Sequence, residues 1–229
     1  GDSDSEAKLE QKDKPRLVIL GTGWGSIALL KHLNPGDYHV TVVSPTNYFL
    51  FTPMLPSATV GTLGLRSLVE PVRRIVQRVH GHFLKGEAQD VDFSEKLVEV
   101  SQLDANGQEQ RFYLPYDKLV IGVGTFETSL PSAGLIFRET NFSDFLGCVT
   151  NPHGVKGLDN CHFLKSIDDA RKIKNKVLEN MELACLPTTS DEERKRLLSF
   201  VVCGGGPTGV EFAAELFDLL NEDLLYSFP

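Results

Sequence analysis

The sequence is poor in cysteine, has no surplus of positive charge and has no long apolar run, and each absence excludes a class of protein. Its four cysteines form no CxxC pair and show no metal-like spacing, which favours isolated reduced thiols over disulfides or a zinc site. The 23 basic and 31 acidic residues leave a net charge of −8, which argues against a nucleic-acid partner. No window approaches the roughly 18 consecutive apolar residues of a membrane-spanning helix, so we expect none.

The remaining composition is that of a soluble globular protein, with 41% hydrophobic and 24% charged residues. The 229 residues suffice for one large domain or two small ones. The opening stretch GDSDSEAKLEQKDK is polar and acidic, and it lacks the Arg-rich amphipathic pattern of a transit peptide. We therefore predict that residues 1–14 are a disordered lead-in.

A strand, a glycine turn, a helix and a second strand follow one another near the start of the chain. Residues 16–20 are a short apolar run typical of a strand buried on both faces. Residues 27–33 have a helical pattern that ends at Asn34-Pro35-Gly36, and residues 38–43 form the next apolar run. Together they span about 30 residues, the length of a βαβ unit.

Turn and capping residues predict most of the other elements. The sequence DANG at 104–107 predicts a β-hairpin, and Ser166 with Asp169 and Ser190 with Glu193 predict helix starts. The predicted elements are a helix over 65–79 that begins or kinks at Pro71, hairpin strands over 97–103 and 108–114, a strand over 118–123, helices after Ser166 and Ser190, a strand over 198–203 and a helix over 210–220.

Two of the predicted strands run into glycine turns that open a helix. The second turn, Gly204-x-Gly206-x-x-Gly209, has the full dinucleotide-binding pattern, and the first, Gly21-x-Gly23-x-x-Ser26, has serine in the last position. Glycines allow the backbone to approach a pyrophosphate, which the free N–H groups of the helix start then bind. One such turn also occurs in ordinary α/β packing, but two in the right context favour two dinucleotide sites.

The sequence departs from the dinucleotide-binding pattern at the residue that would bind the ribose of the first cofactor. About 20 residues after the first turn the pattern calls for Asp or Glu, and this chain has Ser44-Pro45, whose hydroxyl binds a ribose less strongly than a carboxylate. Two dinucleotide sites with no nucleophile or metal cluster between them suggest a flavoprotein that binds FAD and NAD(P)H. The predicted fold class is α/β, a Rossmann-like FAD domain followed by the start of a Rossmann-like NAD domain.

These residues resemble the type II, non-proton-pumping NADH:quinone oxidoreductases, most closely the mitochondrial enzymes of fungi. The resemblance rests on the segments VILGTGWGSIALLKHL, VVSPTNYFLFTPMLPSATVGT, YDKLVIGVG, NPHGVKGLDNCHFLKSIDDARKIK and KRLLSFVVCGGGPTGVEFAAELFDLL. FTPMLPS is the most specific of these, because the glycine turns are shared by all two-dinucleotide flavoproteins. The family also has Ser-Pro after the second strand.

The resemblance implies two sets of binding residues and no catalytic or metal-binding residue. The FAD set is Gly21, Gly23, Trp24, Gly25 and Ser26 at the pyrophosphate, Ser44 and Pro45 near the adenosine ribose, Thr52 and Pro53 beside the isoalloxazine, Ala88 at the adenine, and Gly122 and Gly124 where the FAD domain closes. The NADH set is Gly204, Gly205, Gly206, Pro207, Thr208 and Gly209 at the pyrophosphate, and Glu211 near the nicotinamide. Glu211 is equally explained as a charge favoured by a helix start.

The implied activity is FAD-dependent oxidation of NADH, with electrons passed to ubiquinone and no proton pumping. The implied location is the mitochondrial inner membrane, peripherally bound on either face through a region this chain lacks, and the full-length enzyme is compatible with a homodimer. By this resemblance residues 15–165 are the N-terminal part of the FAD domain and residues 166–229 the start of an NAD(P)H domain that is incomplete at its C-terminus.

Residues 125–147 have no counterpart in the family pattern. Joining Gly124 to Cys148 gives IGVGCVTNPHGVKG, which reads as continuous family sequence. We hypothesise a translated intron there; the alternative is a lineage-specific surface loop.

Two other functions remain as alternatives. The chain could be another two-dinucleotide reductase, such as a sulfide:quinone type, although that chemistry needs a redox cysteine pair that the sequence does not offer. It could also be a non-catalytic fragment.

Overall fold

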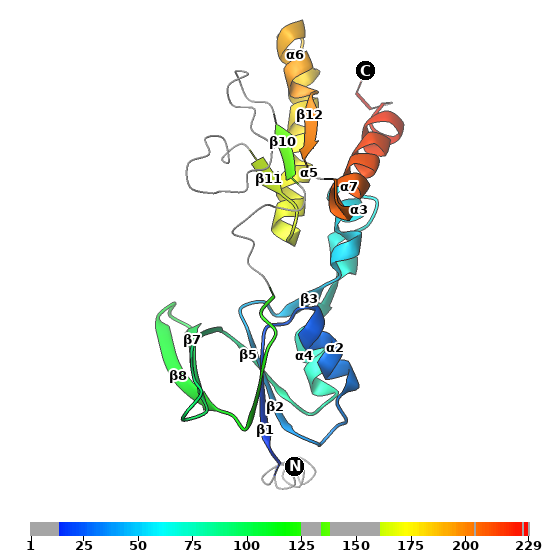
Figure 1. The fold of residues 1–229 in the computed structure, drawn as a ribbon. Helices are drawn as coiled ribbons and strands as arrows, with labels where there is room; N and C mark the ends of the chain where they lie inside the picture. The colour runs from blue at the N-terminus through cyan, green and yellow to red at the C-terminus, as the bar shows by residue number, and fades with distance from the viewer. Residues whose placement is uncertain (1–13, 125–133, 138–160, 204, 226, 229) are drawn as a thin grey trace. The chain divides into compact units, whose positions relative to one another are not determined.

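The computed structural model describes residues 14–124, 134–137, 161–203, 205–225 and 227–228 (Figure 1). The lead-in predicted for residues 1–14 falls almost wholly outside them. Contacts within the chain group it into two compact units, residues 1–50 with 69–125 and residues 51–68 with 126–229. The boundary after residue 165 that the sequence suggested between the two cofactor domains stays a prediction.

The first unit is built on a four-stranded parallel sheet. Its strands are β1 (Arg16–Leu20), β2 (His39–Ser44), β5 (His82–Lys85) and β9 (Lys118–Ile121), in the order β5-β2-β1-β9. In the central register Ile19 lies opposite Val42 on one side and Val120 on the other. Counted along the chain within this sheet, the order is third, second, first, fourth, which is that of dinucleotide-binding folds. The predicted α/β class and the first βαβ unit are confirmed.

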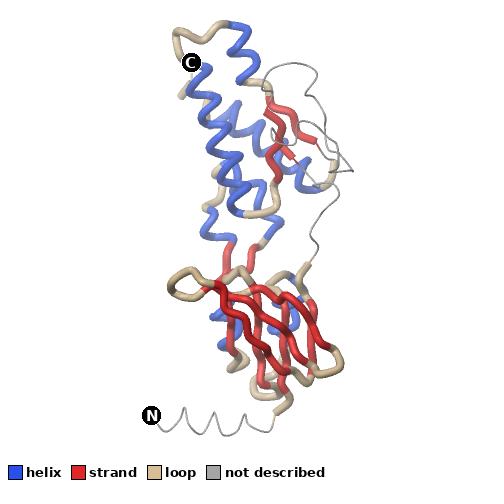
Figure 2. Tube along the Cα trace, turned by 90° about the vertical axis from the view of Figure 1, so that its left-hand side faces the viewer, coloured by secondary structure: helices blue, strands red, loops and turns tan. Residues whose placement is uncertain are grey.

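Both faces of this sheet are covered, by different layers. Helices α2 (Trp24–His32) and α4 (Val72–Gln77) pack on one face, and an antiparallel sheet of β6 (Glu87–Asp92), β7 (Leu97–Leu103) and β8 (Glu109–Pro115) packs on the other (Figures 1 and 2). Leu17 and Ile19 face the helices, and Val18 and Leu20 face the β7 side. Strand β1 is therefore buried on both faces, as its unbroken apolar run predicts.

Three predicted helices differ in the structure. The helix predicted over 210–220 is α7 (Pro207–Asp218), which begins three residues earlier because the second glycine turn runs directly into it. Helix α2 begins at Trp24, not at residue 27, because the glycine turn runs directly into the helix. The helix predicted over 65–79 is a 3-10 turn at Leu65–Leu68, strand β4 (Val69–Pro71) and then α4. Pro71 is the extended residue that precedes α4, and β4 pairs with β3 (Tyr48–Leu50), a tertiary pairing that outweighs the helical periodicity. The predicted hairpin of β7 and β8 is confirmed.

The second unit combines helices with a small antiparallel sheet. Its helices are α3 (Leu55–Val60), α5 (Ile167–Ala184), α6 (Asp191–Leu197) and α7 (Pro207–Asp218), and its strands are β11 (Cys161–Phe163), β10 (Gly134–Phe137) and β12 (Phe200–Cys203), in the order β11-β10-β12. The apolar face predicted for α5 is buried at Ala170, Ile173 and Val177. Among the described residues, no helix is both long enough and apolar enough to cross a bilayer.

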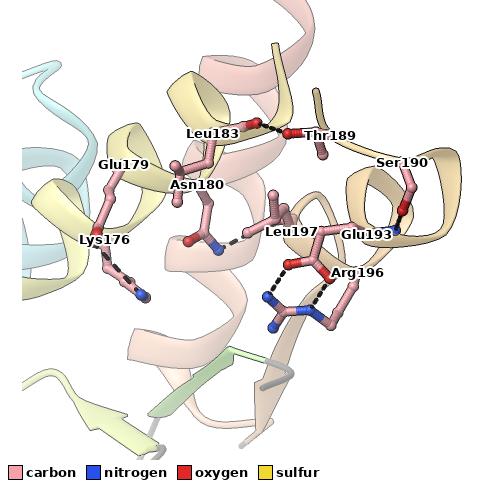
Figure 3. Close-up of polar contacts among 9 residues, drawn as sticks. All are labelled: Lys176, Glu179, Asn180, Leu183, Thr189, Ser190, Glu193, Arg196 and Leu197. Carbon is pink, nitrogen blue, oxygen red and sulfur yellow. Dashed lines mark hydrogen bonds and ion pairs between the residues drawn. The ribbon is translucent and has the colours of Figure 1, made fainter. Parts of the chain in front are cut away.

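Side-chain caps fix the starts of α5 and α6. Ser166 accepts a hydrogen bond from the Asp169 amide, and Asp169 accepts one from the Ser166 amide, which completes the predicted capping box. Ser190 caps α6 by accepting from the Glu193 amide (Figure 3). The buried amide of Asn180 donates to the Leu197 carbonyl at 3.1 Å and so joins α5 to the end of α6. No sequence pattern indicated this contact.

Strand β10 lies inside the stretch 125–147, where no element was predicted. It pairs antiparallel with β12, with Gly134 opposite Cys203, and antiparallel with β11 on its other side. The neighbours of the glycine-turn strand in a dinucleotide-binding fold are parallel to it, so this pairing departs from the family topology. The rest of 125–147 lies outside the described residues, and both origins proposed for it stay open.

A bidentate ion pair joins β1 to β9 at the sheet end opposite the glycine turn. Arg16 donates to Asp117 from its guanidinium (two contacts of 3.0 Å) and from its backbone amide. These side-chain and backbone hydrogen bonds from Arg16 hold the pKa of Asp117 well below its usual range. The pair therefore stabilises the fold at pH above about 4, where the unfolded aspartate is charged, and this contribution is lost as the pH falls further.

Replacement of Asp117 by Asn is expected to lower the urea midpoint at neutral pH and to have a shrinking effect below pH 4. Both side chains are nearly half exposed, so added salt should also reduce the difference. Urea unfolding at a series of pH values measures this. A difference between the variant and the native chain that grows on acidification would contradict the assignment.

Candidate functional site

The first glycine turn lies where the parallel sheet reverses its strand order. After β1 the chain continues to β2 on one side, whereas β9 lies on the other side, and ligands of open α/β sheets bind at such points beyond the carboxyl ends of the strands. Gly21 has φ +93°, and a Cβ on it would lie 2.3 Å from the Gly122 carbonyl oxygen. The Gly21 amide donates to Val43, which ties the turn to β2. Only glycine fits this position.

The start of α2 offers free backbone donors. Gly23 is the N-cap and has no side chain to satisfy them, and the first intrahelical bond runs from the Ile27 amide to the Gly23 carbonyl. The amides of Gly25 and Ser26 precede that bond and have no acceptor among the described residues. A Cβ on Gly25 would meet no atom within 4 Å, so the approach is open. The turn therefore has the form of an anion-binding site.

Ser26, where the pattern has glycine or alanine, is fully buried, and its hydroxyl has no hydrogen-bond partner among the described residues. Its Oγ lies 2.3 Å from where a Cβ on Gly122 would be. The larger residue at position 26 is thus accommodated by the absence of a side chain at Gly122.

We expect Ser26→Ala to raise the free energy of unfolding of the first unit by about 1 kcal/mol, because the substitution removes a buried, unsatisfied hydroxyl and favours the helix. Trp24 is the single tryptophan of the chain and belongs to this unit, so its fluorescence during urea unfolding reports the effect. A lower unfolding midpoint in Ser26→Ala would mean that the hydroxyl has a partner in solution.

Ser44, predicted near the adenosine ribose, is buried and already engaged. Its hydroxyl lies 3.2 Å from the Thr22 hydroxyl and accepts a hydrogen bond from the Thr46 amide. These contacts fix the end of β2 against the glycine turn and leave the Ser44 hydroxyl at most one further bond. Sequence reasoning missed Thr22, since a residue between two glycines gives no sign of a partner 22 positions away.

Beside Pro45 the first unit has a cavity of about 490 Å³. It is lined by Pro45, by Lys85 and Gly86 at the end of β5, by Glu87, and by Ser101 on β7. The Gly86 amide donates to the Ser44 carbonyl, which joins this wall to the end of β2. Ala88, predicted at the adenine, is exposed on β6 next to this wall. Lys85 and Gly86 were not among the predicted site residues, because neither belongs to a motif.

The remaining residues of the predicted FAD set are divided between the two units. Trp24 is half exposed and packs edge-to-face on Phe49, with ring centroids 4.9 Å apart. Thr52 and Pro53 are exposed in a 3-10 turn, Thr52–Met54, which belongs to the second unit. Gly124 has φ +73° at the end of the described part of the first unit.

The second glycine turn repeats the design of the first. Gly206 is the N-cap of α7 without a side chain, Pro207 is the first helical residue, and the Val210 amide makes the first intrahelical bond, to Gly206. The amides of Thr208 and Gly209 therefore precede the helical ladder. A Cβ on Gly205 would meet nothing within 4 Å. Gly204 lies outside the described residues, and Glu211 is exposed in the second turn of α7. Within the described ranges no three His, Cys, Asp or Glu side chains gather as a metal site requires.

The chain matches a family model along nearly its whole length. The model is that of the pyridine nucleotide-disulphide oxidoreductases, and it matches residues 15–225.

The chain is similar to two curated mitochondrial relatives and to one solved structure. External NADH-ubiquinone oxidoreductase 2 of Saccharomyces cerevisiae mitochondria is 47% identical over 94% of this chain and 36% of the relative. External alternative NAD(P)H-ubiquinone oxidoreductase B2 of Arabidopsis thaliana mitochondria is 43% identical over 94% of this chain and 34% of the relative. Plasmodium falciparum NDH2, solved in complex with NADH, is 32% identical with a TM-score of 0.71 over 94% of this chain and 39% of that one. This chain thus spans about a third of the length of the curated relatives it matches.

Proposed function

The chain belongs to the pyridine nucleotide-disulphide oxidoreductase family, and on that premise we propose that it provides the FAD-binding turn and the NADH-binding turn of a non-proton-pumping NADH:ubiquinone oxidoreductase. The observation that carries the proposal is the pair of strand–glycine–helix turns, each with an uncapped helix start open to an anion. The relatives named as NADH-ubiquinone oxidoreductases support the same activity.

The chain's own residues would bind and orient the two cofactors. The amides of Gly25 and Ser26 would donate to the FAD pyrophosphate, and the cavity beside Pro45 and Gly86 would take the adenosine end. The amides of Thr208 and Gly209 would donate to the NADH pyrophosphate in the same manner. When bound, FAD supplies the chemistry by accepting a hydride from NADH and passing two electrons to ubiquinone. Hydride transfer needs no general base.

We further propose that the protein works in mitochondria, at the inner membrane, with ubiquinone as electron acceptor. The support is that the Saccharomyces and Arabidopsis relatives are named mitochondrial ubiquinone oxidoreductases. Peripheral attachment to the membrane and a homodimer are part of this proposal and rest on the family resemblance.

A charge placed in each turn tests the two sites separately. Gly25→Asp should weaken FAD binding by about tenfold or more through repulsion of the pyrophosphate, yet it should not destabilise the fold, because an acid in the first helical turn is favoured. Gly25→Asn is the matched neutral control. Gly205→Asp and Gly205→Asn form the equivalent pair for NADH.

The readout is quenching of Trp24 fluorescence by FAD, then bleaching by NADH of the flavin band at about 450 nm. We expect the native chain to take up FAD, Gly25→Asp to need about ten times more of it than Gly25→Asn, and Gly205→Asp to slow bleaching selectively. Native chain that shows neither quenching nor the flavin band would overturn the proposal. Equal behaviour of the Asp and Asn variants would show that the turns do not bind the phosphates.

A further inference from the structure

One carboxylate on α7 bonds to two hydroxyls of the segment Phe51–Leu68. Glu215 accepts from Ser57 Oγ at 2.6 Å and from Thr62 Oγ1 at 2.8 Å, one bond on each of its two oxygens. Both donors lie more than 150 residues before Glu215, so the contact joins distant parts of the sequence. Hydrogen bonds to an ionised acceptor are roughly twice as strong as neutral ones, which makes this a firm attachment point.

The segment Phe51–Leu68 is unusual in the fold. It belongs to the second unit, whereas the residues on both sides of it belong to the first. Its helix α3 contacts both α5 and α7 and buries Leu55 and Ala58, while α7 buries Phe212 and Leu216. The segment begins with the turn Thr52–Met54, and α7 begins at the second glycine turn.

The end of α3 is fixed close to the Glu215 contact. Gly61 has φ +98°, and the amides of Gly61 and Leu63 both donate to the Ser57 carbonyl, in the same residue whose hydroxyl reaches Glu215. On the α5 side, the Lys174 ammonium lies 2.9 Å from where a Cβ on Gly61 would be, and the positive φ of Gly61 disfavours any side chain at this bend. Loss of the Glu215 carboxylate would therefore free the hydroxyls of Ser57 and Thr62 and weaken the backbone turn at Gly61.

We propose that Glu215 is a positioning residue that holds the segment Phe51–Leu68 on α7 and so fixes the conformation of the Thr52–Met54 turn. The family resemblance assigns Thr52 and Pro53 to the isoalloxazine of the proposed FAD site, and the proposal's catalytic consequence rests on that assignment and on the proposed function. Glu215 is not among the residues proposed to contact either cofactor, and both of its bonds are to Ser57 and Thr62. Its effect would be to keep the flavin-contacting turn in a fixed arrangement with the helix that starts at the second glycine turn.

The test compares Glu215→Ala and Glu215→Gln with Asp218→Asn, an exposed acid almost one turn further along α7. Backbone amide resonances and hydrogen exchange are followed in the full chain at Gly61, Leu63 and Met54. We expect Glu215→Ala to speed exchange at Gly61 and Leu63 by about tenfold or more and to shift the Met54 resonance. The exchange rates in Glu215→Gln should lie between those of Glu215→Ala and of the native chain, because the amide oxygen of Gln still accepts a hydrogen bond from one hydroxyl. The exchange rates in Asp218→Asn should match those of the native chain.

The outcomes separate this proposal from the proposed function. Native exchange in Glu215→Ala, or faster exchange at Gly61 with an unmoved Met54 resonance, overturns the positioning role, since the contact would then be structural only. In FAD-loaded chain we also expect Glu215→Ala to slow bleaching by NADH while the affinity for FAD stays unchanged. If the native chain takes up no FAD, the proposed function fails, and the exchange and resonance measurements still decide the role of Glu215.

Discussion

Gly21→Ala is expected to unfold the first unit or to destabilise it by about 3 kcal/mol or more. A Cβ at this position would lie 2.3 Å from the Gly122 carbonyl oxygen and 2.9 Å from the Val123 Cα, and backbone atoms cannot rotate away as a side chain can. The residue also has φ +93°, which adds strain for any side chain. Urea unfolding followed by Trp24 fluorescence measures the loss.

Gly25→Ala is the matched control, four residues along the same turn. No atom lies within 4 Å of its would-be Cβ, and the residue is helical, so alanine should be neutral or raise the stability by up to about 1 kcal/mol. Equal effects of the two substitutions would contradict the close approach of the β1 turn to the end of β9.

Gly122→Ala should destabilise the first unit by about 2 kcal/mol in the native chain, because its Cβ would lie 2.3 Å from Ser26 Oγ. The same substitution in a Ser26→Ala background should cost under about 1 kcal/mol. There the nearest remaining atoms are the Leu20 carbonyl at 3.3 Å and the residue 26 Cβ at 3.6 Å. The double-mutant cycle thus predicts a coupling of about 1–2 kcal/mol.

Additive effects in this cycle would mean that the Ser26 side chain rotates away from Gly122 without cost. The coupling is informative because it explains how this turn keeps its shape with serine in place of the usual small residue. It also separates the packing role of Ser26 from the role of its backbone amide, which neither substitution removes.

Local sequence patterns predicted much of the fold, and tertiary contacts determined the elements that were not predicted. The apolar run of β1, the DANG turn and the Ser166 capping box each depend on neighbouring residues and were predicted correctly. The stretch 65–79 was predicted as helix because its periodicity is helical, whereas pairing of β4 with β3 needs residues some 20 positions away. Strand β10 likewise forms by pairing with β12 and β11, which are distant in the sequence, so no local pattern predicted it.

In the candidate site, too, the local features were predicted from the sequence and the contacts between distant residues were not. The glycine turns were located from the sequence because helix-start chemistry is local. Sequence reasoning did not find that Thr22 engages Ser44 or that Gly86 lines a cavity with Pro45, since these contacts form between separate strands. The engaged Ser44 hydroxyl gives the Ser-Pro substitution for the usual acid a structural role in the turn, whatever it contributes to the ribose.

The central claim is that the two helix starts are the pyrophosphate sites of two different cofactors. The most direct test is to follow the backbone amide resonances of Gly25 and Ser26, and of Thr208 and Gly209, during titration with FAD, with NADH and with phosphate-free riboflavin. The account predicts that FAD shifts the first pair, NADH shifts the second pair and riboflavin shifts neither. Resonances of both pairs that stay in place with FAD and NADH, or move equally with riboflavin, would contradict it.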